Sequence, residues 1–216
     1  MITEKLHKIK DILPDHVTLV AVSKTKPNAA IEEAYNSGQR VFGENRVQEL
    51  VDKYESLPKD IEWHMIGHLQ RNKVKYIAPF ISLIHGIDTP KLLKEVNKEA
   101  QKNGRIIDCL IQIHIAEEES KHGFSIEEAK ALFEDLDSLN LKNIRLRGLM
   151  GMATFTDDTE KVANEFSSLK SCFDDLRPNQ GSHFDTVSMG MSGDYPIAIE
   201  KGSTMVRIGS SIFGSR

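Results

Sequence analysis

Lys24 is the residue of this sequence whose position is best suited to chemistry. It follows the apolar run at residues 17–22, which predicts a buried strand, and Pro27 separates it from a helical pattern that begins at Asn28. Burial at the end of a strand lowers the pKa of a lysine amine by desolvation, and an unprotonated amine can attack a carbonyl carbon. The alternative for Lys24 is a surface lysine in a loop, which is the position that we expect for Lys26.

Two later loops combine glycine and serine at a position between a predicted strand and a helix. They are residues 188–194 and 207–211. Glycine lets backbone N–H groups approach a ligand, serine adds a hydroxyl, and the start of a helix favours an anion. Tight turns would explain either loop alone, but the pair favours a phosphate site. A carbonyl-reactive lysine opposite such a site suggests pyridoxal 5′-phosphate (PLP), with Arg207 at the ring nitrogen, at the phosphate or in a salt bridge at the rim.

Strand and helix patterns alternate about eight times along the chain. Strands are predicted at 17–22, 41–44, 63–67, 80–84, 106–115, 144–152, 184–188 and 205–208. Helices are predicted at about 2–13, 28–37, 47–54, 72–77, 89–104, 125–136, 162–173 and 197–199. Short loops between them indicate parallel βα units. Eight units in 216 residues favour a closed (β/α)8 TIM barrel with an extra N-terminal helix, and an open doubly wound sheet is the alternative.

Several residues predict where these helices begin and end. Asn45 is a candidate N-cap for the helix that begins at residue 47, and Thr89 before Pro90 is another. Residues 125–128 form a capping box, and Gly38 is a predicted helix stop.

Composition limits the classes of partner and compartment. A net charge of −4 gives no general attraction to nucleic acid or to an anionic membrane, and the apolar runs are too short to span a bilayer. The charged N-terminus does not resemble a signal peptide. Cys109 and Cys172 are isolated, so we expect two buried thiols in a reducing cytoplasm. We expect one domain over residues 1–216.

Seven ordered motifs resemble the pyridoxal phosphate homeostasis protein family, which is related to the N-terminal barrel of alanine racemase. They are residues 21–27, 42–45, 63–73, 121–124, 147–150, 188–194 and 202–209. The resemblance covers essentially the whole chain. It implies that Lys24 carries PLP as a Schiff base and that Arg207 faces the pyridine nitrogen, with a phosphate contact still open. The remaining implied pocket residues are Ser192, Gly193, Gly209 and Ser210 around the phosphate, and Asn45 and Met191 as lesser members.

The same resemblance implies a role in PLP supply and in the balance of B6 vitamers and amino acids, without an established catalytic turnover. Racemisation needs a proton donor and a proton acceptor on opposite faces of the carbanion, and Lys24 can serve one face. The racemases add a tyrosine from a C-terminal domain, which we expect to be absent because the chain ends soon after the last strand. An arginine at the ring nitrogen would also weaken the ring as an electron sink. His68 and Lys121 could offer a substitute acid, although hydrogen bonding at the rim is favoured.

Three functions are therefore compatible with the sequence. They are a PLP carrier that acts in vitamin B6 homeostasis, a weak PLP-dependent amino-acid racemase or related enzyme, and a phosphosugar-type barrel enzyme with an aldolase-like lysine. We favour the carrier. It would act as a cytoplasmic monomer with PLP-dependent apo-enzymes as its recipients. We assign no residue a catalytic role and expect no metal ligand.

Overall fold

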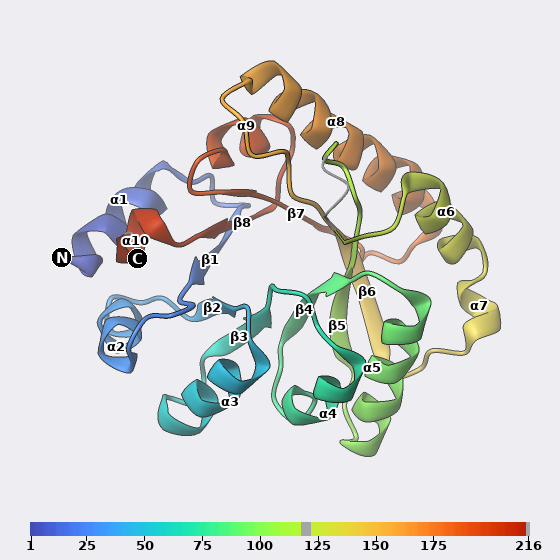
Figure 1. Cartoon of the computed structure of the whole chain (residues 1–216), viewed down its shortest axis with the longest axis horizontal. Coiled ribbons are helices and arrows are strands. Elements are labelled where there is room, and N and C mark those ends of the chain that lie inside the picture. The colour runs from blue at the N-terminus through green and yellow to red at the C-terminus, as the bar shows by residue number, and fades with distance from the viewer. Residues whose placement is uncertain (118–121, 215–216) are drawn as a thin grey trace.

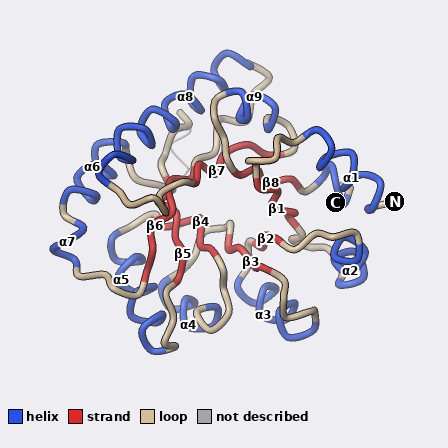
Figure 2. Tube along the Cα trace, turned by 180° about the vertical axis from the view of Figure 1, so that it is seen from behind, coloured by secondary structure: helices blue, strands red, loops and turns tan. Residues whose placement is uncertain are grey.

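The chain folds into a closed barrel of eight parallel strands surrounded by helices. The structure, a computed structural model, describes residues 1–117 and 122–214. Neighbouring strands pair in sequence order, and β1 (Thr18–Val22) closes the barrel by pairing with β8 (Met205–Ile208). Figure 1 shows the helices outside the strands, and Figure 2 shows the same arrangement from behind. The predicted barrel is confirmed, and the open sheet is excluded.

The other elements alternate between strand and helix as the sequence predicts. The remaining strands are β2 (Val41–Glu44), β3 (Glu62–Met65), β4 (Leu83–Ile87), β5 (Ile107–Gln112), β6 (Ile144–Met150) and β7 (Thr186–Met191). The helices are α1 (Ile2–Ile12), α2 (Asn28–Asn36), α3 (Val47–Ser56), α4 (Val74–Ile77), α5 (Pro90–Lys102), α6 (Ile126–Glu134), α7 (Leu136–Leu139), α8 (Thr159–Leu176), α9 (Tyr195–Glu200) and α10 (Ser210–Phe213). Two short 3₁₀ helices, Arg71–Lys73 and Arg177–Asn179, add to these.

Two predicted strands are displaced. The fourth was expected at 80–84 but lies at Leu83–Ile87, because Phe80 stacks on Tyr54 of α3 instead, with 3.8 Å between the ring centroids. The polar His85 made this strand look as if it ended early, although His85 is fully buried. The seventh strand continues to Met191, beyond the predicted end at residue 188.

Most of the predicted helix ends are confirmed. The Thr89 side chain accepts a hydrogen bond from the Leu92 amide, and Ser125 and Glu128 form the reciprocal capping box. Gly38 has a positive φ of 84°, as a glycine after a helix end should. The predicted cap at Asn45 is wrong, because the residue before α3 is Arg46 and no side chain caps that end.

Apolar side chains fill two separate regions. The larger cluster lies between strands and helices and includes Leu19 and Ala21 of β1. The smaller one is made by Val20, Leu83, Leu110, Met150 and Met205, one residue from each of five strands. Because successive strand residues point to opposite faces, this second cluster lies inside the barrel.

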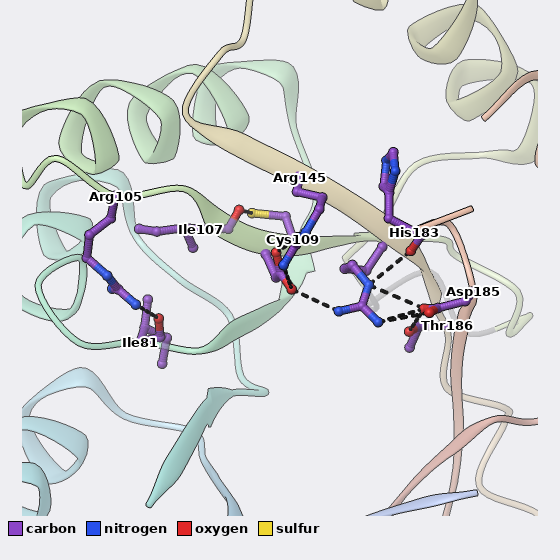
Figure 3. A network of polar contacts seen from close by, with 10 residues as sticks. Ile81, Arg105, Ile107, Cys109, Arg145, His183, Asp185 and Thr186 are labelled. Carbon is purple, nitrogen blue, oxygen red and sulfur yellow. Dashed lines mark hydrogen bonds and ion pairs between the residues drawn. The ribbon is translucent and has the colours of Figure 1, made fainter. Parts of the chain in front are cut away.

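Charged residues tie three strands together near the beginnings of β5, β6 and β7 (Figure 3). Asp108 of β5 accepts hydrogen bonds from Arg145 Nε at 2.7 Å and from Arg147 Nη1 at 3.0 Å. Arg147 Nη2 also donates to Asp185 Oδ1 at 2.8 Å. In barrels of this kind the amino ends of the strands serve stability, while sites occur at the carboxyl ends. We therefore assign this ion network a structural role.

The described part of the chain contains no helix that is long and apolar enough to cross a membrane. Cys109 and Cys172 are both buried and not disulfide-bonded, as predicted.

Candidate functional site

A cavity of about 680 Å³ lies at the carboxyl ends of the strands. Its lining comes mainly from the loops after β1, β6, β7 and β8. All eight residues that the sequence predicted for a cofactor pocket line it: Lys24, Asn45, Met191, Ser192, Gly193, Arg207, Gly209 and Ser210. The structure thus brings together residues that are up to 186 positions apart in the chain, from 24 to 210. Lys26 lies in the loop between β1 and α2 and is partly exposed, and it lines the cavity as well.

The backbone on either side of Lys24 is held by a buried ion network. Lys53 of α3 donates to the Ser23 carbonyl oxygen at 2.8 Å and to Oε1 of Glu44 at 2.7 Å. It also contacts Oε1 of Glu49 at 2.6 Å, and that oxygen accepts the Thr25 amide at 2.6 Å. Thr25 has a φ of 64°, a conformation that a β-branched residue rarely adopts. These bonds fix both neighbours of Lys24 and hold this strained turn in place.

Glu44 is the most unusual member of this network. It is fully buried, and Ser23 Oγ donates to its Oε1 at 2.6 Å. Its other carboxylate oxygen, Oε2, is buried without a hydrogen-bond partner. Burial raises the pKa of Glu44, and the hydrogen bonds from Lys53 and Ser23 only partly oppose this. The charge on Lys53 is therefore what makes an ionised Glu44 tolerable at this position.

Arg207 projects from β8 into the barrel and lines the floor of the cavity. It is 4% exposed, and its Nη1 donates to the carbonyl oxygen of Ser188 at 2.9 Å and to Ser188 Oγ at 2.6 Å. Its Nη2 donates to the Gly151 carbonyl oxygen at 3.1 Å. Burial lowers the pKa of Arg207 to about 10, so the guanidinium stays charged at neutral pH. Hydrogen bonds to Ser188 of β7 and to Gly151, directly after β6, therefore fix the orientation of the guanidinium.

A chain of hydrogen bonds continues from Arg207 across the inside of the barrel. Ser188 Oγ lies 3.0 Å from His85 Nδ1, and His85 Nε2 lies 3.0 Å from His64 Nδ1. Burial lowers the pKa of both histidines, that of His64 to about 3. Both rings are neutral at physiological pH, so they orient Ser188 without adding a second positive charge beside Arg207.

The loops after β7 and β8 meet at Ser192 and Gly209. The Gly209 amide donates to Ser192 Oγ at 3.2 Å. A Cβ added to Gly193 would meet no heavy atom within 4 Å, so open space lies beside this loop. Asp194 accepts the Met191 amide at 2.5 Å, which closes the turn that presents the serine. The Gly209 amide and the Ser192 hydroxyl, which come from two loops, therefore lie together beside open space, a combination that suits an anion.

The loop after β6 is a part of the lining that sequence reasoning missed. Residues 152–157 line the cavity, and the carboxylate of Glu165 on α8 accepts both the Thr154 amide at 2.6 Å and the Thr154 hydroxyl at 2.7 Å. Phe155, at the tip, is 97% exposed. The polar run after strand six could have indicated this loop, but nothing local in the sequence pairs Glu165 with it.

The sequence offers His68 and Lys121 as substitute acids. His68 lies outside the lining of the cavity and has its Nδ1 3.0 Å from Asp88 Oδ2, so the rim interpretation is the one that its geometry supports. Lys121 lies outside the described residues.

Comparisons with known proteins agree with this geometry. The family model "Alanine racemase, N-terminal domain" matches residues 1–216. The pyridoxal phosphate homeostasis protein of Aquifex aeolicus is 44% identical over 92% of this chain and 86% of its own length. The structure of PipY from Synechococcus elongatus without PLP has a TM-score of 0.92 at 34% identity and covers 99% of this chain and all of its own. The structure of the same protein with PLP bound has a TM-score of 0.88 with the same coverage.

Proposed function

Since this chain belongs to the alanine racemase N-terminal domain family, and within it to the pyridoxal phosphate homeostasis proteins, we propose that it binds PLP covalently at Lys24 and takes part in intracellular PLP homeostasis. The observation that carries the proposal is the single cavity that contains Lys24, Arg207 and the two loops at Ser192 and Gly209. PLP supplies an aldehyde, with which an unprotonated lysine amine condenses to a Schiff base with loss of water.

The residues of the cavity fit such a cofactor. About 680 Å³ is ample for one pyridine ring with a phosphate. Ser192 Oγ and the Gly209 amide would meet the phosphate, because they already converge on one another and Gly193 leaves space beside them. Arg207 would meet the ring from the floor of the barrel. Its two terminal nitrogens are fixed by Ser188 and Gly151, which supports a contact to the ring nitrogen over one to the phosphate.

A PLP titration tests the assignment of the lysine. The purified chain should develop an absorbance of the lysine adduct that saturates at one PLP per chain, and Lys24→Ala should abolish it. Lys26→Ala is the matched control, because Lys26 lines the same cavity and contacts the Gly214 carbonyl oxygen. If Lys26→Ala rather than Lys24→Ala removes the adduct, the assignment is wrong.

We extend the proposal to a carrier that passes PLP to apo-enzymes rather than turning over amino acids. The cavity is open to solvent, since Phe155 is 97% and Met191 37% exposed. Its described lining includes no histidine, tyrosine or cysteine, which are common partners of a lysine in two-sided proton transfer. Exclusion of water protects carbanion chemistry, so an open site suits release better.

Two assays separate the carrier from an enzyme. The PLP-loaded chain should reactivate an apo-transaminase faster than PLP dissociates into buffer. Incubation with L-alanine and a panel of other amino acids, followed by chiral chromatography, should show no multiple turnovers. Multiple turnovers that disappear in Lys24→Ala would replace the carrier by a weak racemase.

The proposal also includes a monomer in the cytoplasm. The two buried cysteines, which form no disulfide, support a reducing compartment. Light scattering of the purified chain would test the monomer, and a mass of two chains would contradict it.

A further inference from the structure

Three residues that the sequence scatters over 55 positions, from 68 to 122, come together on the rim of the barrel. His68 follows β3, Asp88 follows β4, and His122 lies beyond the end of β5. Each offers one ligand atom, and these atoms all lie within 4.8 Å of one another. None of the three lines the cavity that contains Lys24. The group is therefore separate from the proposed cofactor site.

The backbone fixes each of the three positions. The chain beside His122 pairs with β5, since the Phe124 amide donates to the Gln112 carbonyl oxygen at 2.8 Å and the His114 amide donates to the Phe124 carbonyl oxygen at 2.9 Å. Gln112 Nε2 also donates to the carbonyl oxygen of His122 itself at 2.8 Å. Asp88 directly follows β4 and precedes Thr89, the cap of α5. His68 precedes the buried Leu69, which anchors the loop after β3.

The side chains already face one another. His68 Nδ1 lies 3.0 Å from Asp88 Oδ2, and the rings of His68 and His122 stack with 4.3 Å between their centroids and 21° between their planes. The Asp88 side chain is only 9% exposed, whereas that of His68 is 47% exposed. A nearly buried carboxylate thus lies under two imidazoles that solvent can reach.

Two imidazoles and a carboxylate are a donor set for a divalent transition-metal ion. Zinc takes histidine nitrogen and carboxylate oxygen in open sites with three protein ligands, whereas calcium and magnesium require oxygen ligands. Tetrahedral zinc with bonds of about 2.0–2.1 Å holds its ligand atoms about 3.3 Å apart. The longest separation, at most 4.8 Å, must therefore shorten by at most about 1.5 Å. The two stacked rings must also turn so that their in-plane nitrogen lone pairs converge, which rotation of the exposed histidine side chains can supply.

We propose that His68, Asp88 and His122 form a binding site for a divalent transition-metal ion of the zinc class. Bound metal would link the ends of three consecutive strands and keep at least one coordination position open to water. From the sequence we expected no metal ligand, and the three residues lie far apart along the chain. The barrel creates the site by placing successive strand ends side by side.

Titration calorimetry of the full-length chain with zinc chloride, after treatment with EDTA, tests the proposal. Wild type should bind one zinc ion per chain. His68→Gln and His122→Gln should each weaken binding at least about tenfold, since even residues that only orient metal ligands contribute 10–100-fold. Cobalt added in place of zinc should give visible d–d bands in wild type that both variants lose. These bands report coordination and would not arise from a hydrogen bond or a ring stack.

His16→Gln is the matched control, because His16 is exposed and outside the group. It should bind zinc like wild type. Thermal melting of every variant identifies any that fails to fold. PLP absorbance shows whether the variants carry equal amounts of PLP. A difference in zinc affinity between variants with equal PLP content then does not depend on whether Lys24 binds PLP. The proposal is overturned if wild type shows no saturable zinc binding, or if the two ligand variants bind zinc as tightly as His16→Gln.

Discussion

Replacing Lys53 by methionine removes the cation that pairs with Glu44 while it keeps an unbranched side chain of similar length. Lys53 Nζ contacts the Ser23 carbonyl oxygen, Glu44 and Glu49 at 2.8, 2.7 and 2.6 Å, and its side chain is 6% exposed. Removing one partner of a buried ion pair costs about 3–5 kcal/mol. We therefore expect a large loss of free energy of unfolding in Lys53→Met.

Proton uptake by Glu44 sets the pH dependence of this loss. Burial already raises the pKa of Glu44, and without Lys53 the carboxyl should be neutral in the folded chain. Protonating a glutamate of ordinary pKa 4.3 at pH 7.5 costs about 4 kcal/mol, from about 1.4 kcal/mol per pH unit. A carboxyl with a raised pKa in the folded state binds more protons there than in the unfolded state, so stability falls as pH rises above about 4.3. Protonation should contribute at most about 4 kcal/mol to the loss at pH 7.5 and at most about 1 kcal/mol at pH 5, because the raised pKa of Glu44 already costs the wild type part of this energy. The lost hydrogen bonds add to it.

Urea unfolding followed by circular dichroism at pH 5 and at pH 7.5 measures both values. Lys98→Met is the control, since Lys98 makes an exposed ion pair with Glu95, with the lysine side chain 57% exposed, and such pairs contribute at most about 1 kcal/mol. PLP retention should fall in Lys53→Met and should not change in the control. The Ser23 carbonyl oxygen loses its partner, and so does Glu49, the carboxylate that accepts the Thr25 amide. A loss in Lys53→Met that equals the control, or that does not depend on pH, would refute the reasoning.

The other predictions concern the floor of the cavity, the phosphate loops, the strand beginnings and the buried histidines. Arg207→Gln should raise the dissociation constant for PLP about ten- to a hundredfold, from about 1.5–3 kcal/mol for a charge-assisted bond, and an unchanged constant in equilibrium dialysis would remove Arg207 from the site. Ser192→Ala should weaken PLP binding but leave the reducible lysine adduct, which absorbance titration and reduction measure separately. Asp108→Asn should lower the free energy of unfolding by about 1–3 kcal/mol without changing PLP affinity, as urea unfolding and dialysis would show. His85 is neutral when folded because burial lowers its pKa, so the unfolded chain binds more protons below about pH 6.5, and acid destabilises the fold. His85→Asn should therefore make the loss of stability between pH 6.5 and 4.5 shallower, by up to about 1.4 kcal/mol per pH unit, and an equal slope in both proteins would show that His85 does not contribute.

The sequence predicts the barrel and much of the cavity because both depend on local patterns. Alternating strand and helix periods specify βα units, and their short connections force parallel strands. Lys24 and Ser192 could be found because a strand end places its side chains at a known face of the barrel. In a closed barrel, residues at the carboxyl ends of the strands lie on the same face, however far apart they are in the sequence.

Residues that act through long-range contacts escaped prediction. Lys53 looks like an exposed helical lysine, and only its packing against the ends of β1 and β2 shows that it is buried with Glu44. His85 interrupts an apolar run, so the fourth strand was predicted to end before it. The sequence does not show that Ser188 of β7 is a hydrogen-bond partner for this histidine, which makes its burial acceptable. These polar contacts inside the barrel depend on which strands face each other across it.

The most direct test of the central claim is the identity of the lysine that carries PLP. The chain is loaded with PLP, reduced with borohydride, digested and analysed by mass spectrometry of the modified peptides. The account predicts one reduced adduct per chain, at Lys24 between the anchored residues Ser23 and Thr25. A dominant adduct at Lys26, Lys73 or any other lysine would contradict it.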